Sequence, residues 1–147
     1  MIQVRRILYP TDFSSYSNQA YFHAVDLAET YGASLAVVYV HQPGAAGGHD
    51  RRYWRSQLEQ VRPANPTIRV QHVFLEGDAA AEIVRYAADE GVDVIVIGTH
   101  GRTGVERLVM GSVAEKVMRE APCSVLVVKL PKGAPAAERP LTAGAAV

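Results

Sequence analysis

Glycines and a serine stand on either side of a nine-residue gap in the second half of the chain. The first group is Gly98-Thr99-His100-Gly101, and the second is Gly111 followed by Ser112. The first group directly follows the apolar run 94–97, and the second opens a helical pattern. Glycines allow a backbone to approach a ligand closely, and the N–H groups at a helix start bind anions. The spacing therefore predicts a cradle for nucleotide phosphates, and ATP is the ligand that we expect.

Each side chain of this cradle has a role and a plainer alternative. The Ser112 hydroxyl, with the backbone N–H groups of Ser112 and Val113, can donate hydrogen bonds to phosphate oxygens. Arg102 can pair with phosphate charge, and His100 can donate a hydrogen bond. In the alternative, the glycines only make tight turns, Ser112 is an ordinary helix-start serine, and Arg102 and His100 are solvated. The predicted cradle contacts are Gly98, His100, Gly101, Arg102, Gly111, Ser112 and Val113.

Short apolar runs alternate with helical patterns along the chain, and these elements must position the cradle. We expect strands at residues 4–9, 34–40, 68–74, 93–97 and 124–128, with helices between them. The last two runs are continuously apolar, as in strands covered on both faces, whereas the third alternates and has one face nearer water. This order predicts an α/β fold: an open, five-stranded, mostly parallel sheet with helices on both faces, Rossmann-like and suited to adenine nucleotides.

A second segment is expected to face the same ligand. Open parallel sheets bind ligands beyond the carboxyl ends of their strands, where the winding reverses. Pro10, Thr11 and Asp12 follow the first strand, so they share a crevice with the cradle if the first and fourth strands are neighbours. Asp12 could accept hydrogen bonds from ribose or adenine, or it could merely cap the following helix. Val40 and Ile97 end two strands and are expected near the adenine or in the core.

Composition narrows the class of protein. The 147 residues are 48% hydrophobic and 20% charged, which is typical of one globular domain. Fifteen basic and fifteen acidic residues cancel, so neither nucleic acid nor a membrane is an expected partner. A single cysteine and the lack of a secretory or membrane-spanning segment favour the cytoplasm. We expect a domain at residues 1–130 and a flexible tail at 131–147. The histidines show no metal-ligand spacing, so no metal site is predicted.

Over residues 2–130 the chain resembles the universal stress protein family, of the single-domain, ATP-binding kind. The resemblance rests on the early Asp12, on the closing segment 121–128, and on the spacing of Gly98, Gly101, Gly111 and Ser112. The short segment between the second and third strands departs from the longer loop and helix of many members. The resemblance implies that Asp12 lies near the nucleoside, and it implies a homodimer. The last strand, Ser124–Val128, is expected at the sheet edge, where it would pair with the same strand of a second copy or be covered by the tail.

The sequence leaves three functional hypotheses open. No Gly-x-x-x-x-Gly-Lys-Ser/Thr motif occurs, and Lys116, the nearest lysine, lies beyond the first turn of its helix. Phosphoryl transfer needs metal and positive charge around the terminal phosphate, and this sequence offers little of either near the predicted cradle. The first hypothesis is therefore a regulatory protein that holds ATP, with or without Mg²⁺, and responds through conformation and dimerisation. The second is a slow ATPase or self-phosphorylating protein, and the third is a nucleotide-free interaction module.

Overall fold

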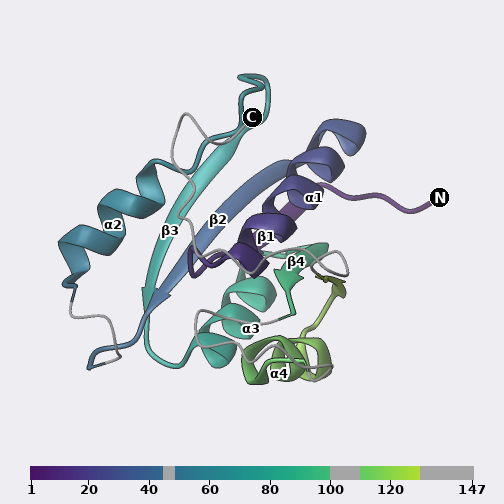
Figure 1. Ribbon diagram of the computed structural model, residues 1–147. Coiled ribbons are helices and arrows are strands. Elements are labelled where there is room, and N and C mark those ends of the chain that lie inside the picture. The colour runs from purple at the N-terminus through teal and green to yellow at the C-terminus, as the bar shows by residue number, and fades with distance from the viewer. Residues whose placement is uncertain (45–48, 100–109, 130–147) are drawn as a thin grey trace.

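The computed structural model describes residues 1–44, 49–99 and 110–129. Strands and helices alternate along the whole described chain, as the apolar runs predict (Figure 1). Their bounds are β1 Arg6–Pro10, α1 Ser15–Tyr31, β2 Ser34–His41, α2 Arg51–Glu59, β3 Val70–Glu76, α3 Ala79–Asp89, β4 Val94–Gly98, α4 Ser112–Glu120 and β5 Ser124–Val128. The first and third strands thus begin two residues later than the sequence predicts. None of the helices in these ranges is long and apolar enough to cross a membrane.

The five strands form one sheet in the order β3-β2-β1-β4-β5, and every pairing in it is parallel. The central strand β1 pairs with β2 on one side, for example Ile7 with Leu35, and with β4 on the other, for example Leu8 with Ile95. The winding therefore reverses between β1 and β4. The predicted fold class is confirmed, and so is the expectation that the first and fourth strands are neighbours.

Helices cover both faces of this sheet and make two separate cores. Successive strand residues point to opposite faces, so Ile7 and Tyr9 contribute to the core under α1 and α2, whereas Leu8 contributes to the core under α3 and α4. Figure 1 shows α2 alongside β2 and β3, and shows α3 and α4 as neighbours. Helix α1 ends where Gly32 adopts the left-handed conformation, at φ 64°.

The last strand corrects one prediction. The run Ser124–Val128 forms the edge strand β5, as expected, but it is not covered on both faces, because Leu126 is 39% exposed. The physical reason is position, since an edge strand lies partly beyond the helices that cover the middle of the sheet. The third strand was expected to have one face nearer water. It forms the opposite edge strand β3, and it is half-buried over most of its length, so its two faces do not differ in this way.

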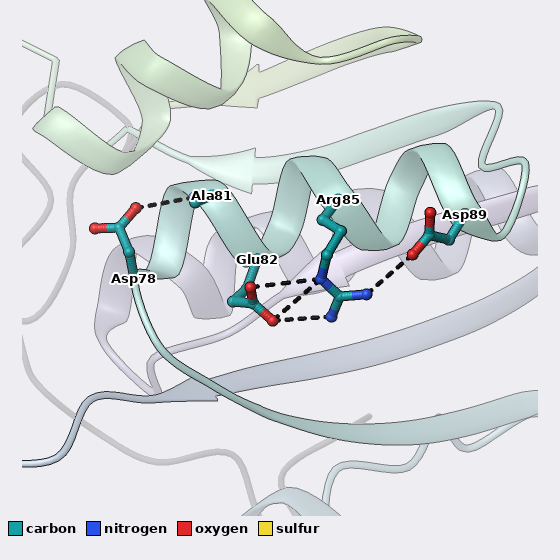
Figure 2. Close-up of polar contacts among 5 residues, drawn as sticks. All are labelled: Asp78, Ala81, Glu82, Arg85 and Asp89. Atoms are coloured by element: carbon teal, nitrogen blue, oxygen red, sulfur yellow. Dashed lines mark hydrogen bonds and ion pairs between the residues drawn. The ribbon is translucent and has the colours of Figure 1, made fainter.

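Polar contacts fix the start and the outer face of α3. Asp78 caps this helix by accepting a hydrogen bond from the Ala81 N–H at 3.0 Å, and Arg85 bridges Glu82 at 2.8 Å and Asp89 at 3.0 Å (Figure 2). The Lys116 Nζ of α4 lies 3.7 Å from the Asp78 carboxylate. The lysine nearest to the predicted cradle is therefore directed at the start of α3.

Candidate functional site

The turn that follows β1 is held by its own side chains. The Thr11 N–H donates to the Val38 carbonyl at 2.8 Å, and the Thr11 hydroxyl accepts from the Phe13 N–H at 3.0 Å. Both Pro10 and Thr11 are buried. The side chains of these two predicted site residues therefore shape the turn from inside the protein.

Phe13 adopts an unusual backbone conformation in this turn. Its φ is 67°, in the left-handed region that a bulky residue rarely occupies. The ring is buried between Tyr39, at 5.3 Å between centroids, and Trp54, at 5.5 Å. Strain of this kind persists where the surroundings over-determine it, and such positions cluster at functional sites. Packing of α2 and β2 against Phe13 thus fixes the residue that follows Asp12.

Asp12 lies half-buried in the same turn, at the carboxyl edge of the sheet. Its Oδ1 accepts a hydrogen bond from the Ser14 N–H at 3.0 Å. The N-cap of α1 is Ser14, whose hydroxyl accepts from the Ser17 N–H at 3.3 Å. The alternative reading of Asp12 as the helix cap is therefore wrong, because Ser14 serves that purpose.

Gly98 at the end of β4 lies against the first turn of α1. A Cβ at this position would sit 2.6 Å from the carbonyl oxygen of Tyr16 and 2.7 Å from its carbon. Since these are backbone atoms of a helix, no rotamer change can relieve such a contact. Packing alone thus requires glycine at position 98, and this contact brings the start of α1 onto the end of β4.

Two hydrogen bonds join the end of β4 to β5 and to α4. The Thr99 N–H donates to the Val128 carbonyl at 3.1 Å, and the Gly111 N–H donates to the Thr99 carbonyl at 2.6 Å. Gly111 is the N-cap of α4 and, having no side chain, offers no side-chain acceptor to the first N–H groups of the helix. Ser112 is exposed as the first residue of α4, which agrees with its plainer reading as a helix-start serine and leaves its hydroxyl at the surface. The amino end of α4 thus lies at the tip of β4.

The structure brings several predicted site residues to one edge of the sheet. Residues 10–12, Gly98 and the segment 111–113 all follow or adjoin the ends of the neighbouring strands β1 and β4. The side chains of Ile97, Val40 and Val113 pack with the core under α3 and α4. The predicted residues His100, Gly101 and Arg102 lie outside the described residues.

The sequence pattern did not single out the contact that anchors α1 to β1. The Tyr9 hydroxyl donates to the Ser17 carbonyl at 2.7 Å inside the protein, and burial raises the pKa of Tyr9 well above its ordinary value. The Ser17 hydroxyl donates to the Ser14 carbonyl at 3.1 Å and lies 3.3 Å from that of Thr11. The spacing of Ser14 and Ser17 was the available signal, because it places two hydroxyls on one helical turn.

Two further observations concern the potential metal ligands of the described residues and a small hollow away from the predicted site. Within residues 1–44, 49–99 and 110–129, no group of three potential metal-ligating side chains occurs. A small hollow of about 110 Å³ lies next to the amino ends of β2 and β3, at the end of the sheet opposite the candidate site. Its lining is Ala28, Glu29, Gly32, Ala33, Asn65, Thr67, Ile68 and Arg69.

Together, the parallel sheet, the reversal between β1 and β4 and the turns gathered there define a doubly wound α/β protein with its candidate site at the switch point. The model that describes the universal stress protein family matches residues 3–129. A universal stress protein of Methanocaldococcus jannaschii is 35% identical in an alignment 142 residues long that covers 87% of this chain and 84% of that one. The chain belongs to the universal stress protein family.

Solved structures of related proteins share the fold. A universal stress protein in complex with cAMP has a TM-score of 0.67 at 20% identity, covering 86% of this chain and 98% of its own. A family protein from Arabidopsis thaliana with AMP bound has a TM-score of 0.63 at 14% identity, covering 87% of this chain and 93% of its own.

Proposed function

We propose that this chain is a cytoplasmic regulatory protein that binds an adenine nucleotide, with ATP as its main ligand, between the turn after β1 and the start of α4. One observation carries the proposal above others: the Gly111 N–H bonds the Thr99 carbonyl at 2.6 Å. This bond holds the amino end of α4 at the tip of β4. Because β4 is the neighbour of β1, the helix start and Asp12 adjoin one switch point.

The phosphates belong at the start of α4 in this proposal. Among the described residues no side chain caps the helix, so its first N–H groups can donate to a ligand, and the exposed Ser112 hydroxyl adds another donor. The amino end of a helix also carries partial positive charge, which favours an anion. Gly101, His100 and Arg102 would complete the phosphate cradle. Mg²⁺, where present, would reach Asp12 only through a phosphate oxygen or water.

The nucleoside belongs near the turn after β1. The Asp12 carboxylate can accept hydrogen bonds from ribose hydroxyls or from the adenine edge, in addition to the one from Ser14. Val40 and the backbone at the end of β4 would border the base. Two proteins of the same fold that were solved with cAMP and AMP support an adenine nucleotide as the ligand class.

A homodimer formed through β5 is part of the same proposal. The strand is at the edge of the sheet that the described residues form, where the backbone groups on its outer side can pair with a further strand. Leu126 on this strand is 39% exposed. If β5 of a second copy paired with this strand, Leu126 would be buried and β5 would no longer be an edge strand.

Mass spectrometry of the small molecule released when the purified full chain is denatured tests the proposal. ATP in near-stoichiometric amount is the expected result, and intact triphosphate would argue against fast hydrolysis. ADP or AMP would instead favour the slow ATPase. A protein that carries no nucleotide, and whose thermal midpoint does not move with added ATP, would overturn nucleotide binding and favour the interaction module.

A further inference from the structure

Arginines gather on the helix that borders the edge strand β3 and on the segment that follows it. Residues 51–69 hold five of the fifteen basic residues of this neutral chain, all of them arginine, and one acidic residue, Glu59. All five arginines are exposed: Arg51, Arg52, Arg55, Arg62 and Arg69. The guanidinium group presents a planar fork of N–H donors that matches the two oxygens of a carboxylate. This part of the surface therefore suits a partner with negative charge.

Two of these arginines reach onto β3. The Arg51 guanidinium of α2 lies 2.8 Å from the Glu76 carboxylate. The guanidinium of Arg55 lies 4.4 Å from the centroid of the Phe74 ring. Residues four apart in a helix lie on the same face, and Figure 1 shows α2 alongside β3. One flank of α2 thus directs two positive charges at the edge strand.

The contacted residues of β3 also turn their backbone groups outward. The Leu35 N–H donates to the Arg69 carbonyl at 2.8 Å, and the Gly77 N–H donates to the His41 carbonyl at 3.0 Å. Odd-numbered positions of this segment therefore direct their backbone groups at β2, and alternation along the strand directs those of even-numbered positions away from it. Within the described part of the chain, no backbone hydrogen bond involves the outward groups, which belong to Val70, His72, Phe74 and Glu76.

Charge decides which kind of strand can pair with this edge. Two copies that join through β3 about a two-fold axis would bring the same flank of α2 together. Arg51 and Arg55 of one copy would then face those of the other, and like charges repel. An extended peptide with acidic side chains meets the opposite situation. It can pair with the outward backbone groups while its carboxylates accept hydrogen bonds from the arginines.

We propose that β3 and the adjoining flank of α2 form a docking edge, defined by Arg51, Arg55, Phe74 and Glu76, for an extended acidic segment of a partner protein. The segment adds a sixth strand beside β3. Alternate side chains of a strand lie on one face of the sheet, so acidic residues at every second position face the arginines. Glu76 already pairs with Arg51 and competes with the carboxylates of the partner. The inference goes beyond nucleotide binding and does not depend on it.

Fluorescence anisotropy of a labelled eight-residue peptide of alternating glutamate and valine, titrated with the full chain, tests the docking edge. The wild type should bind the peptide. Arg55→Glu should weaken binding at least tenfold, because repulsion replaces attraction, whereas Arg55→Lys keeps the charge and should stay within about threefold. Glu76→Gln should strengthen binding about two- to fivefold, since it releases Arg51 from an exposed ion pair. A gain of affinity cannot result from unfolding.

The controls separate the docking edge from general attraction between charges. Arg119→Glu makes the same change of charge on α4, which packs on the other face of the sheet, and should leave binding within about twofold of the wild type. A peptide of alternating lysine and valine should not bind. The acidic peptide methylated at every backbone nitrogen should not bind either, because it cannot donate to the outward carbonyls of β3.

Three results would overturn the inference. The first is an acidic peptide that binds neither the wild type nor Glu76→Gln. The second is equal binding of the methylated peptide, which would rule out an added strand. The third is a labelled ten-nucleotide oligouridylate that binds more tightly than the peptide, which would make this surface one for nucleic acid. The titrations contain no ATP, so failure of the proposed nucleotide binding leaves their outcome unaffected.

Discussion

The rings of Phe13 and Trp54 are stacked, with centroids 5.5 Å apart and an angle of 8° between their planes. Phe13 immediately follows Asp12, and Trp54 is a buried residue of α2. The stack therefore connects a helix on one face of the sheet with the turn that presents the candidate nucleoside contact. It also holds Phe13 at a φ of 67°, which the residue would not favour in isolation.

Removing the Phe13 ring should damage both the fold and the site. Phe13→Ala is expected to lower the free energy of unfolding by about 3–5 kcal/mol, because a large buried ring is lost from the core. ATP affinity should fall as well, since the turn around Asp12 loses its support. Urea denaturation and calorimetry measure the two effects.

The control for this variant is Phe22→Ala, which truncates an aromatic ring of α1 that is 38% exposed. This change should cost about 1 kcal/mol or less, because surface substitutions have small effects, and should leave ATP affinity unaltered. Equal costs for the two variants would contradict the role given to the stack.

Gly98→Ala should destabilise the protein by about 1–3 kcal/mol, the usual cost of forcing extra atoms into a packed interior. The added Cβ would meet the Tyr16 carbonyl at 2.6 Å and push α1 away from β4. ATP affinity should fall with stability, because the site is built where these two elements meet. Gly91→Ala provides the comparison: Gly91 has φ 62° and open space around it, so strain should cost stability without weakening ATP binding. A Gly98→Ala protein of wild-type stability would refute the contact.

Much of the fold could be predicted because its signals are local. Apolar runs, helical periodicity and the glycines at helix ends identified the elements, and the alternation of strands with helices then left few topologies. The exposure of Leu126 was not predictable from its apolar run, because it depends on where β5 lies in the sheet. A continuously apolar strand has the same sequence pattern whether it lies at the edge of a sheet or in its middle.

The site was predictable in outline but not in its contacts. Asp12 and Ser14 are both good helix caps, and only the observed hydrogen bonds decide between them. The reason for glycine at position 98 lies in Tyr16, far away in the sequence. The left-handed φ of Phe13 has no sequence signal, since glycine or asparagine would be expected there.

Two buried tyrosines should respond differently to removal of the hydroxyl. Tyr9→Phe loses the bond to the Ser17 carbonyl and should cost about 0.5–1.5 kcal/mol at pH 7. Tyr21→Phe should be neutral or stabilising, because the Tyr21 hydroxyl is buried without a partner in the described part of the chain. Urea denaturation of both variants at pH 7 measures the difference, and a larger loss for Tyr21→Phe would contradict it.

Alkaline pH should weaken the fold through the same residues. Burial raises the pKa of Tyr21 to about 12, so the folded state retains a proton that the unfolded chain releases at its ordinary pKa of about 10. The free energy of unfolding should therefore fall as pH rises from about 10 through about 12. The Tyr21→Phe variant should lose less stability over this window than the wild type. Parallel pH profiles for the two proteins would show that Tyr21 does not contribute.

A charge on the edge strand should separate the proposed dimer. Leu126→Glu puts a carboxylate on an exposed position of β5, where pairing of two copies would bury it without a partner. Light scattering after gel filtration should give the mass of two chains for the wild type and of one chain for the variant. Met118→Glu, a change at an exposed residue of α4, should leave the mass unchanged. A wild-type protein that elutes as a single chain at all concentrations would rule out this dimer.

The most direct test of nucleotide binding at the switch point is a calorimetric titration of ATP into the wild type and into Asp12→Asn. The asparagine keeps an oxygen that can accept from the Ser14 N–H, so the turn and the stability should be preserved. Asp26→Asn, an exposed change on α1, is the control. We expect ATP to bind to the wild type and to the control, and to bind about tenfold more weakly to Asp12→Asn, since a hydrogen bond to a charged acceptor is lost. ATP binding that is equal in all three proteins would contradict the site.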